Sequence, residues 1–184
     1  ETVSQFNVSI AGAEANVTGA LSRLGWSCGW VSSLPNTPLG RRILNEFRQT
    51  GLDMSAVVWS DQHRMATLFV EYAVPPRSTQ VLFDRAASCF ANLTPDEIDW
   101  TYLLDTRLIH LTGITASLSP SCREILAETV RRAKQYNIPV SIDVNYRERL
   151  WSQAEAAEVL SPLIQSADIH FCGQADAERV FGCS

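Results

Sequence analysis

The stretch that decides the fold is Ile-Pro-Val-Ser-Ile-Asp-Val-Asn-Tyr-Arg at residues 138–147. Its apolar first half predicts a buried strand, and polar side chains follow at the carboxyl end, which is where open α/β sheets bind their ligands. Alternation along an extended segment predicts that Asp143, Asn145 and Arg147 lie on one side and the intervening valine and tyrosine on the other. Arg147 then offers a planar fork of five N–H donors to a carboxylate or phosphate. The alternative is that Asp143 to Asn145 form a turn and that Arg147 is a surface residue.

Composition and charge exclude several classes of protein. The 184 residues are 46% hydrophobic and carry a formal net charge of −5, which fits a globular protein with a core and argues against a general nucleic-acid binder. Basic residues are scattered except for two arginine pairs at 41–42 and 131–132, which we interpret as solvated helix faces. No apolar run approaches the ~20 residues that span a bilayer, and no signal-peptide pattern is present, so we expect a cytoplasmic protein with no membrane partner.

The five cysteines are widely spaced, form no Cys-x-x-Cys pair and are accompanied by only three histidines. This pattern predicts reduced and mostly buried thiols and argues against a zinc site.

Around the central strand, the sequence alternates between helical and extended patterns. Helical patterns are expected at 18–24 (ended by Gly25), 39–50, 120–136, 152–166 (with Pro162 bending or ending it) and 174–181, and strands at 26–31, 108–111, 140–144 and 168–172. Strand-helix-strand units of this length predict a mostly parallel sheet with right-handed crossovers, and hence an α/β fold.

Between residues 55 and 93 the pattern changes to short extended runs at 56–59, 66–73 and 80–83. These runs predict a small antiparallel sheet inserted between αβ units, which would serve as a flap or interface because so few strands cannot form an independent core. An ordinary β-meander attached to one domain is the alternative.

Five motifs occur in an order that resembles the ribokinase-like (PfkB) carbohydrate kinases, and among them the 2-keto-3-deoxygluconate kinases. The motifs are Gly-Ala-Glu-Ala-Asn-Val at 12–17, Leu-Gly at 24–25 and again at 39–40, His-Leu-Thr-Gly-Ile at 110–114 and Asp-Val-Asn-Tyr-Arg at 143–147. The resemblance runs from about Phe6 to Gly182. It implies one partial ribokinase-like domain over residues 1–184, with the lid strands at about 55–93 inserted.

The resemblance also implies which residues contact the sugar. The family's Gly-Gly-Ala-x-x-Asn segment reads Ala-Gly-Ala-Glu-Ala-Asn here at 11–16, and the lid arginine of the family matches Arg85. The substrate-binding residues implied in this way are Gly12, Asn16, Arg85, Ile114, Asn145 and Arg147.

Each of these assignments has a structural alternative. Gly12 and Asn16 could simply begin a helix, Arg85 could be solvated, and Ile114 could be plain core packing. Asp84 and Leu68 stand where the family's tyrosines are expected, and a carboxylate that faced an anionic sugar acid would repel it.

Two acids are candidates for a link to phosphate or metal. The family's Asn-x-x-Glu motif should fall at 173–176, where Gly173 and Asp176 replace both signature residues. Asp176 could stand in for the glutamate or be an ordinary helix N-terminal acid. Asp143 is expected to hold its loop, and no complete metal site is predicted.

No Gly-Ala-Gly-Asp sequence, which in the family carries the catalytic aspartate, occurs in the 184 residues, so no catalytic residue is predicted here. We therefore expect an incomplete domain, lacking its C-terminal part, from an enzyme that transfers the γ-phosphoryl of ATP to a sugar or sugar acid, with Mg²⁺ neutralising phosphate charge. The chain would supply the substrate side and assemble into a homo-oligomer through the lid.

A non-catalytic sugar-acid-binding or regulatory protein is the main alternative function. A dinucleotide-binding oxidoreductase is disfavoured because no Gly-x-Gly-x-x-Gly follows a strand.

Overall fold

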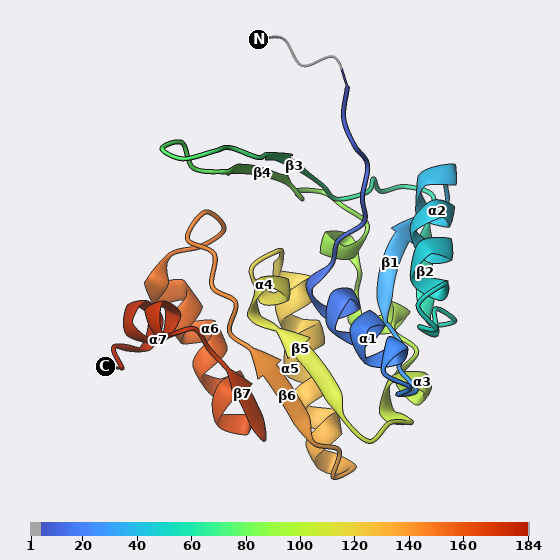
Figure 1. Ribbon diagram of the computed structural model, residues 1–184. Coiled ribbons are helices and arrows are strands. Elements are labelled where there is room, and N and C mark those ends of the chain that lie inside the picture. Colours follow the sequence, from blue (N-terminus) through green and yellow to red (C-terminus); the bar gives the residue numbers. More distant parts are fainter. Residues whose placement is uncertain (1–4, 184) are drawn as a thin grey trace.

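Parallel strands flanked by helices form the body of the protein, and the computed structural model describes residues 5–183 (Figure 1). One parallel sheet has the order β5-β6-β7, with β5 at Ile109–Thr112, β6 at Val140–Asp143 and β7 at Ile169–Phe171. A second parallel pair joins β1 (Ser32–Pro35) to β2 (Val57–Ser60). The predicted α/β class and the strand at 140–144 are therefore confirmed.

Helices and strands alternate along most of the chain, and several helices begin or end at recognisable caps. Ser119 and Ser152 accept hydrogen bonds from the first-turn N–H groups of α5 and α6, and Gly51, at φ +88°, follows the end of α2. The helices are α1 (Ala13–Arg23), α2 (Pro38–Arg48), α3 (Trp100–Leu104), α4 (Gly113–Ala116), α5 (Pro120–Gln135), α6 (Gln153–Ser166) and α7 (Gln174–Phe181), with short 3₁₀ turns η1 (Phe90–Asn92) and η2 (Pro95–Glu97).

Two main hydrophobic clusters hold these layers together. The larger lies between the β5-β6-β7 sheet and the apolar faces of α5 and α6, where Ile142 and Leu160 are fully buried. The smaller joins α1, α2, β1 and β2 around Leu34, Leu44 and Phe47. Burial of these side chains is the main source of stability for a sheet of short strands.

The strand predicted at 26–31 is wrong, because β1 begins at Ser32. Residues 26–31 instead connect α1 to β1, and Gly29 forms an isolated bridge with Asp53. The Tyr102 side chain lies so close to Gly29 that a side chain at position 29 would collide with it. The sequence from Ser32 to Pro35 has poor strand propensity, yet every residue in it is buried, so tertiary packing decides its conformation.

A two-stranded hairpin, which we call the lid, projects from the body (Figure 1). It consists of β3 (Thr67–Glu71) paired antiparallel with β4 (Gln80–Asp84). The third strand expected here, at 56–59, does not belong to it: it forms β2 and pairs with β1, because Val57 is buried in the smaller cluster.

The structure decides two further expectations. Of the two outcomes expected at Pro162, an end to the helix does not occur, because α6 continues to Ser166 with Leu160 and Leu163 buried against the larger cluster. The cysteines are free, as expected, but only two are buried, and Cys172 and Cys183 are exposed because they follow the solvent-facing strand β7 and helix α7.

None of the helices between residues 5 and 183 combines the length and apolar character needed to cross a bilayer.

Candidate functional site

The carboxyl ends of β5 and β6 lie below the lid, next to the N-terminus of α1 (Figure 1). Thr112 ends β5 and Asp143 ends β6, and the two residues pair in register. Segments distant in sequence thus meet at the edge of the sheet where parallel α/β folds bind ligands.

The loop after β6 combines the two conformations considered from the sequence. Val144 and Tyr146 are 1% and 5% exposed, whereas Arg147 is exposed, so the expected alternation of burial is confirmed. The turn is present as well, because Asp143 Oδ1 accepts a hydrogen bond from Asn145 N at 3.2 Å and Asn145 has φ +42°. The buried residues and the turn together fix the direction in which Arg147 leaves the sheet.

Asp176 also supports this loop. Its Oδ2 accepts a hydrogen bond from Tyr146 N at 3.2 Å, and the residue lies in the first turn of α7. The observed role matches the alternative of a helix N-terminal acid. Asp143 and Asp176 therefore each use a carboxylate oxygen on the backbone of the same loop.

Two arginines from different segments face the same region. Arg147 donates to the neighbouring Tyr146 carbonyl oxygen at 2.8 Å, and the half-buried guanidinium of Arg85 lies 4.2 Å from the centre of the Phe83 ring. Burial and then the positive charge of Arg147 lower the pKa of Arg85, while the Glu14 carboxylate acts in the opposite direction. Arg85 is therefore within electrostatic range of both Arg147 and Glu14.

Glu14 is a site residue that the sequence reasoning missed. Its Oε1 accepts hydrogen bonds from Thr115 Oγ1 at 2.7 Å and Thr112 Oγ1 at 3.1 Å, both on buried residues. An acid in the first turn of α1 was visible in the sequence, but its partners about 100 residues later were not. Glu14 joins the N-terminus of α1 to the end of β5.

The remaining predicted residues contribute to different degrees. Gly12 is the N-cap of α1 with extended backbone (φ −175°), and Asn16 is exposed on that helix, with no side-chain hydrogen bond to any residue between 5 and 183. Ile114 is 9% exposed within α4, which matches the alternative of core packing. The structure therefore places Gly12 and Asn16 at the start of α1, Arg85 directly after β4, and Asn145 and Arg147 in the loop after β6, and it buries the Ile114 side chain.

The carboxylate of Asp84 is occupied by a neighbour. The Arg64 guanidinium forms an ion pair with it and also donates to the Ala86 carbonyl oxygen at 2.8 Å. The repulsion of an anionic ligand that Asp84 could cause is thus offset by a paired positive charge. Arg64 was not anticipated, because the pair joins residues 20 apart across the base of the lid.

A metal ion is not accommodated by the described residues alone. Between residues 5 and 183 no group of three or more His, Cys, Asp or Glu side chains is arranged to hold one. Asp143 and Asp176, the two candidates, each accept one hydrogen bond from a backbone N–H group of the β6 loop.

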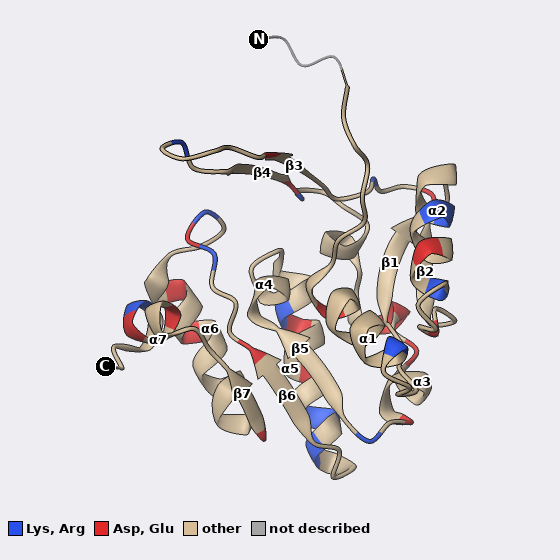
Figure 2. Ribbon diagram, viewed as in Figure 1, with Lys and Arg blue, Asp and Glu red and all other residues tan. Residues whose placement is uncertain are grey.

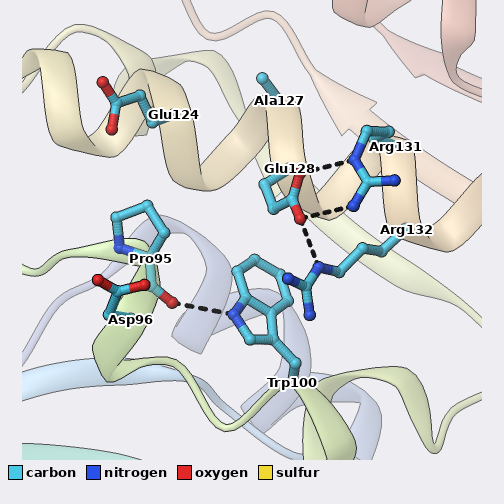
Figure 3. A pocket seen from close by; sticks show the side chains of 8 residues that line it. All are labelled: Pro95, Asp96, Trp100, Glu124, Ala127, Glu128, Arg131 and Arg132. Atoms are coloured by element: carbon cyan, nitrogen blue, oxygen red, sulfur yellow. Dashed lines mark hydrogen bonds and ion pairs between the residues drawn. The ribbon is translucent and has the colours of Figure 1, made fainter.

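A surface hollow of about 450 Å³ lies elsewhere, between α5 and the η2–α3 segment (Figure 3). Its arginines are already paired: Glu128 accepts from both Arg131 and Arg132, which lowers the pKa of Glu128 to about 2, and Arg132 stacks on Trp100 at 4.2 Å. We do not assign this hollow as the site, because its cationic groups are satisfied within the protein.

Comparison with known proteins agrees with this geometry. The family model described as pfkB family carbohydrate kinase matches residues 1–184. The chain is 35% identical over 180 residues to 2-dehydro-3-deoxygalactonokinase of Haloferax volcanii and 33% identical over 181 residues to 2-dehydro-3-deoxygluconokinase of Bacillus subtilis. Each match covers 98% of this chain but 56% of the relative, so the chain spans about half the length of these curated relatives.

Solved structures give the same result for the fold. The crystal structure of 2-dehydro-3-deoxygluconokinase from Thermotoga maritima superimposes with a TM-score of 0.94 at 33% identity, covering 98% of this chain and 56% of that one. The predicted ribokinase-like fold is confirmed, and the chain belongs to the pfkB family of carbohydrate kinases.

Proposed function

We propose that the protein containing this chain is a kinase that transfers a phosphoryl group from ATP to a hydroxyl of a sugar acid resembling 2-keto-3-deoxygluconate. The observation that carries the proposal is the pair of arginines, Arg85 directly after lid strand β4 and Arg147 in the loop after β6, at the carboxyl end of the sheet. Among the described residues neither guanidinium has a carboxylate ion-pair partner. Two such cations provide binding energy for an anion.

Charge favours a sugar acid over a neutral sugar. With a neutral ligand, the mutual repulsion of Arg85 and Arg147 would persist, whereas a carboxylate between them neutralises it. Asp84 does not cancel this advantage because Arg64 pairs with it. The substrate class is therefore supported by the balance of charge at the site.

The residues would divide the work in the following way. Arg147 would bind the carboxylate of the sugar acid or the transferred phosphate, with Asn145 beside it as a hydrogen-bond donor, while Gly12 and Asn16 would contact the sugar. Phosphoryl transfer depends chiefly on positioning and on stabilising charge, so a loop whose backbone is fixed by Asp143 and Asp176 suits it.

ATP and Mg²⁺ are proposed for the whole enzyme. Because the described carboxylates do not form a magnesium site, we assign no step to the metal here, and we assign no residue of this chain as the base that deprotonates the sugar hydroxyl.

We also propose that residues 1–184 form part of one domain and that copies of the protein associate through the lid. Phe69 and Leu82 on the two lid strands are 48% and 64% exposed, and Tyr72 at its end is 85% exposed. Exposed apolar side chains on a two-stranded hairpin whose outer edges have no strand partner favour association between copies.

The test is ATP consumption by the natural full-length protein against a panel of sugar acids and neutral hexoses. Replacing Arg147 with alanine should lower kcat/KM for 2-keto-3-deoxygluconate by roughly 10- to 100-fold, the range expected for a charge-assisted hydrogen bond. Arg131→Ala, which removes an arginine that is 61% exposed on α5, should leave kcat/KM unchanged.

Turnover of hexoses but not of sugar acids would refute the proposed substrate class. A folded protein that binds sugar acids in calorimetry but consumes no ATP would refute the kinase and support the non-catalytic binding protein.

A further inference from the structure

The loop that carries Arg147 also reaches the lid directly. Arg149 Nη1 donates a hydrogen bond to the backbone carbonyl oxygen of Val81 in β4 at 2.9 Å, joining residues 68 positions apart. Figure 1 shows the β6–α6 connection rising from the sheet toward the lid, and Figure 2 shows that it carries basic residues with an acidic residue between them.

A second attachment of the lid is at its base. There Arg64 binds Asp84 and the Ala86 carbonyl, and its own carbonyl oxygen accepts from Cys89 N at 2.9 Å. Val81 lies about 10 Å farther out along β4, at ~3.3 Å per residue. Apart from the pairing of β3 with β4, no described helix or strand makes extensive contact with the lid. Beyond its base, the lid is held by the Arg149 contact and by the Phe6 ring, which packs edge-on against Phe69 with ring centroids 6.0 Å apart.

The two contacting segments also carry the two site arginines. Arg85 follows β4 directly, and Arg147 precedes Arg149 by two residues in the loop. Repulsion between Arg85 and Arg147 acts at the base of the lid, where Arg64 already binds Asp84 and the Ala86 carbonyl oxygen on either side of Arg85. The bond between Arg149 and Val81 instead holds the outer part of the lid against the loop that carries Arg147.

We infer that Arg149 is a positioning residue that fastens the outer part of the lid to the β6–α6 loop and so holds the lid next to Arg147 for substrate binding. The inference rests on the proposed function for its effect on binding, but the contact itself does not. Since the acceptor is a backbone carbonyl oxygen, this contact requires the N–H donors of Arg149 but no particular side chain at position 81.

The test compares Arg149→Met with Arg77→Met in the natural full-length protein. Methionine keeps an unbranched apolar stem but removes every donor. Arg77 is the matched control, because it is a lid arginine whose side chain is 75% exposed and lies 3.8 Å from Glu71 within the same hairpin. The measurements are amide hydrogen exchange of residues 67–71 and 80–84 without ligand, and then kcat and KM for the sugar acid.

Arg149→Met should accelerate exchange in the lid by roughly 3- to 10-fold and raise KM by a similar factor, with kcat changed by less than about 2-fold, as expected for one solvent-exposed charge-assisted hydrogen bond. Arg77→Met should change neither quantity.

Unchanged amide hydrogen exchange in the lid of Arg149→Met would show that Arg149 does not hold the lid, whatever the activity. Faster exchange with an unchanged KM would overturn the positioning role. If no substrate is turned over by either protein, the proposed function fails, and the exchange data still decide whether Arg149 holds the lid.

Discussion

Replacing Gly113 with alanine should disturb both stability and the candidate site. Gly113 begins α4 directly after β5, and a Cβ atom there would lie 2.2 Å from the Val144 carbonyl oxygen and 3.1 Å from both methyl carbons of Leu160. The Leu160 side chain is fully buried, and the Val144 oxygen is backbone, so neither can give way cheaply. The close approach of α4 to the end of β6 therefore requires glycine.

The expected cost follows from the shift that the substitution demands. The Cβ and the carbonyl oxygen must separate by about 1 Å, which moves the backbone immediately before Asn145 and Arg147. Overpacking of this kind costs about 1 to 3 kcal/mol, and we expect about 3 kcal/mol because backbone has to move. The same displacement should raise KM for the sugar acid several-fold, because it moves the Arg147 fork.

Urea unfolding of the full-length protein measures the first effect. Gly173→Ala is the matched control, because its added Cβ would meet no atom within 4 Å and the residue lies at an ordinary φ of −67°. It should change the free energy of unfolding by no more than about 0.5 kcal/mol. Equal stabilities for the two variants would refute the argument that α4 and β6 approach each other so closely.

Three further predictions concern other parts of the chain. Glu14→Ala leaves two buried threonine hydroxyls without their acceptor and should destabilise the fold by about 1 to 3 kcal/mol in urea unfolding, a loss that replacing both threonines with valine should partly restore. Burial and the hydrogen bond to Asp53 raise the pKa of Tyr102 from 10.0 to about 12, so its stabilising contribution is complete below pH 10.0 and is lost as the pH rises through about 12. The Tyr102→Phe variant should therefore lose less free energy of unfolding between about pH 9 and about pH 11 than the unsubstituted protein does. An equal loss in the two proteins would contradict the assignment. If copies associate through the lid, Leu82→Glu should lower the sedimenting mass without changing far-UV circular dichroism, whereas an unchanged mass would exclude Leu82 from the contact.

Local sequence patterns correctly predicted those elements in which the buried residues follow the expected hydrophobic periodicity. The strand at 140–143 and the helices at 120–135 and 174–181 match the expectation closely, because their apolar faces and caps are continuous in sequence. The prediction failed where distant contacts override local preference. Ser32 to Pro35 is a strand only because both sides are covered, and residues 57–60 left the predicted lid because β1 offers them a parallel partner.

The candidate site was predictable only in part for the same reason. The direction of Arg147 followed from alternation in the loop, and the lid position of Arg85 followed from the resemblance. The positions of Glu14, Arg64 and Arg149 as partners did not, since each contacts a residue between 20 and 101 positions away. Hydrophobic periodicity, which reflects local structure, does not predict contacts between residues so far apart in the sequence.

The separation of the two parallel sheets has a consequence for folding. β1 pairs with β2, β5 pairs with β6 and β7, and each sheet has its own hydrophobic cluster, so each set of strands acquires its hydrogen-bond partners without the other. Such segments behave as separate cooperative units in native-state hydrogen exchange. The strands at 32–35 and 57–60 should share one opening free energy, and those at 109–112 and 140–143 should share another. Glu14 links α1 to β5, so it should determine how strongly the opening of one unit promotes the opening of the other.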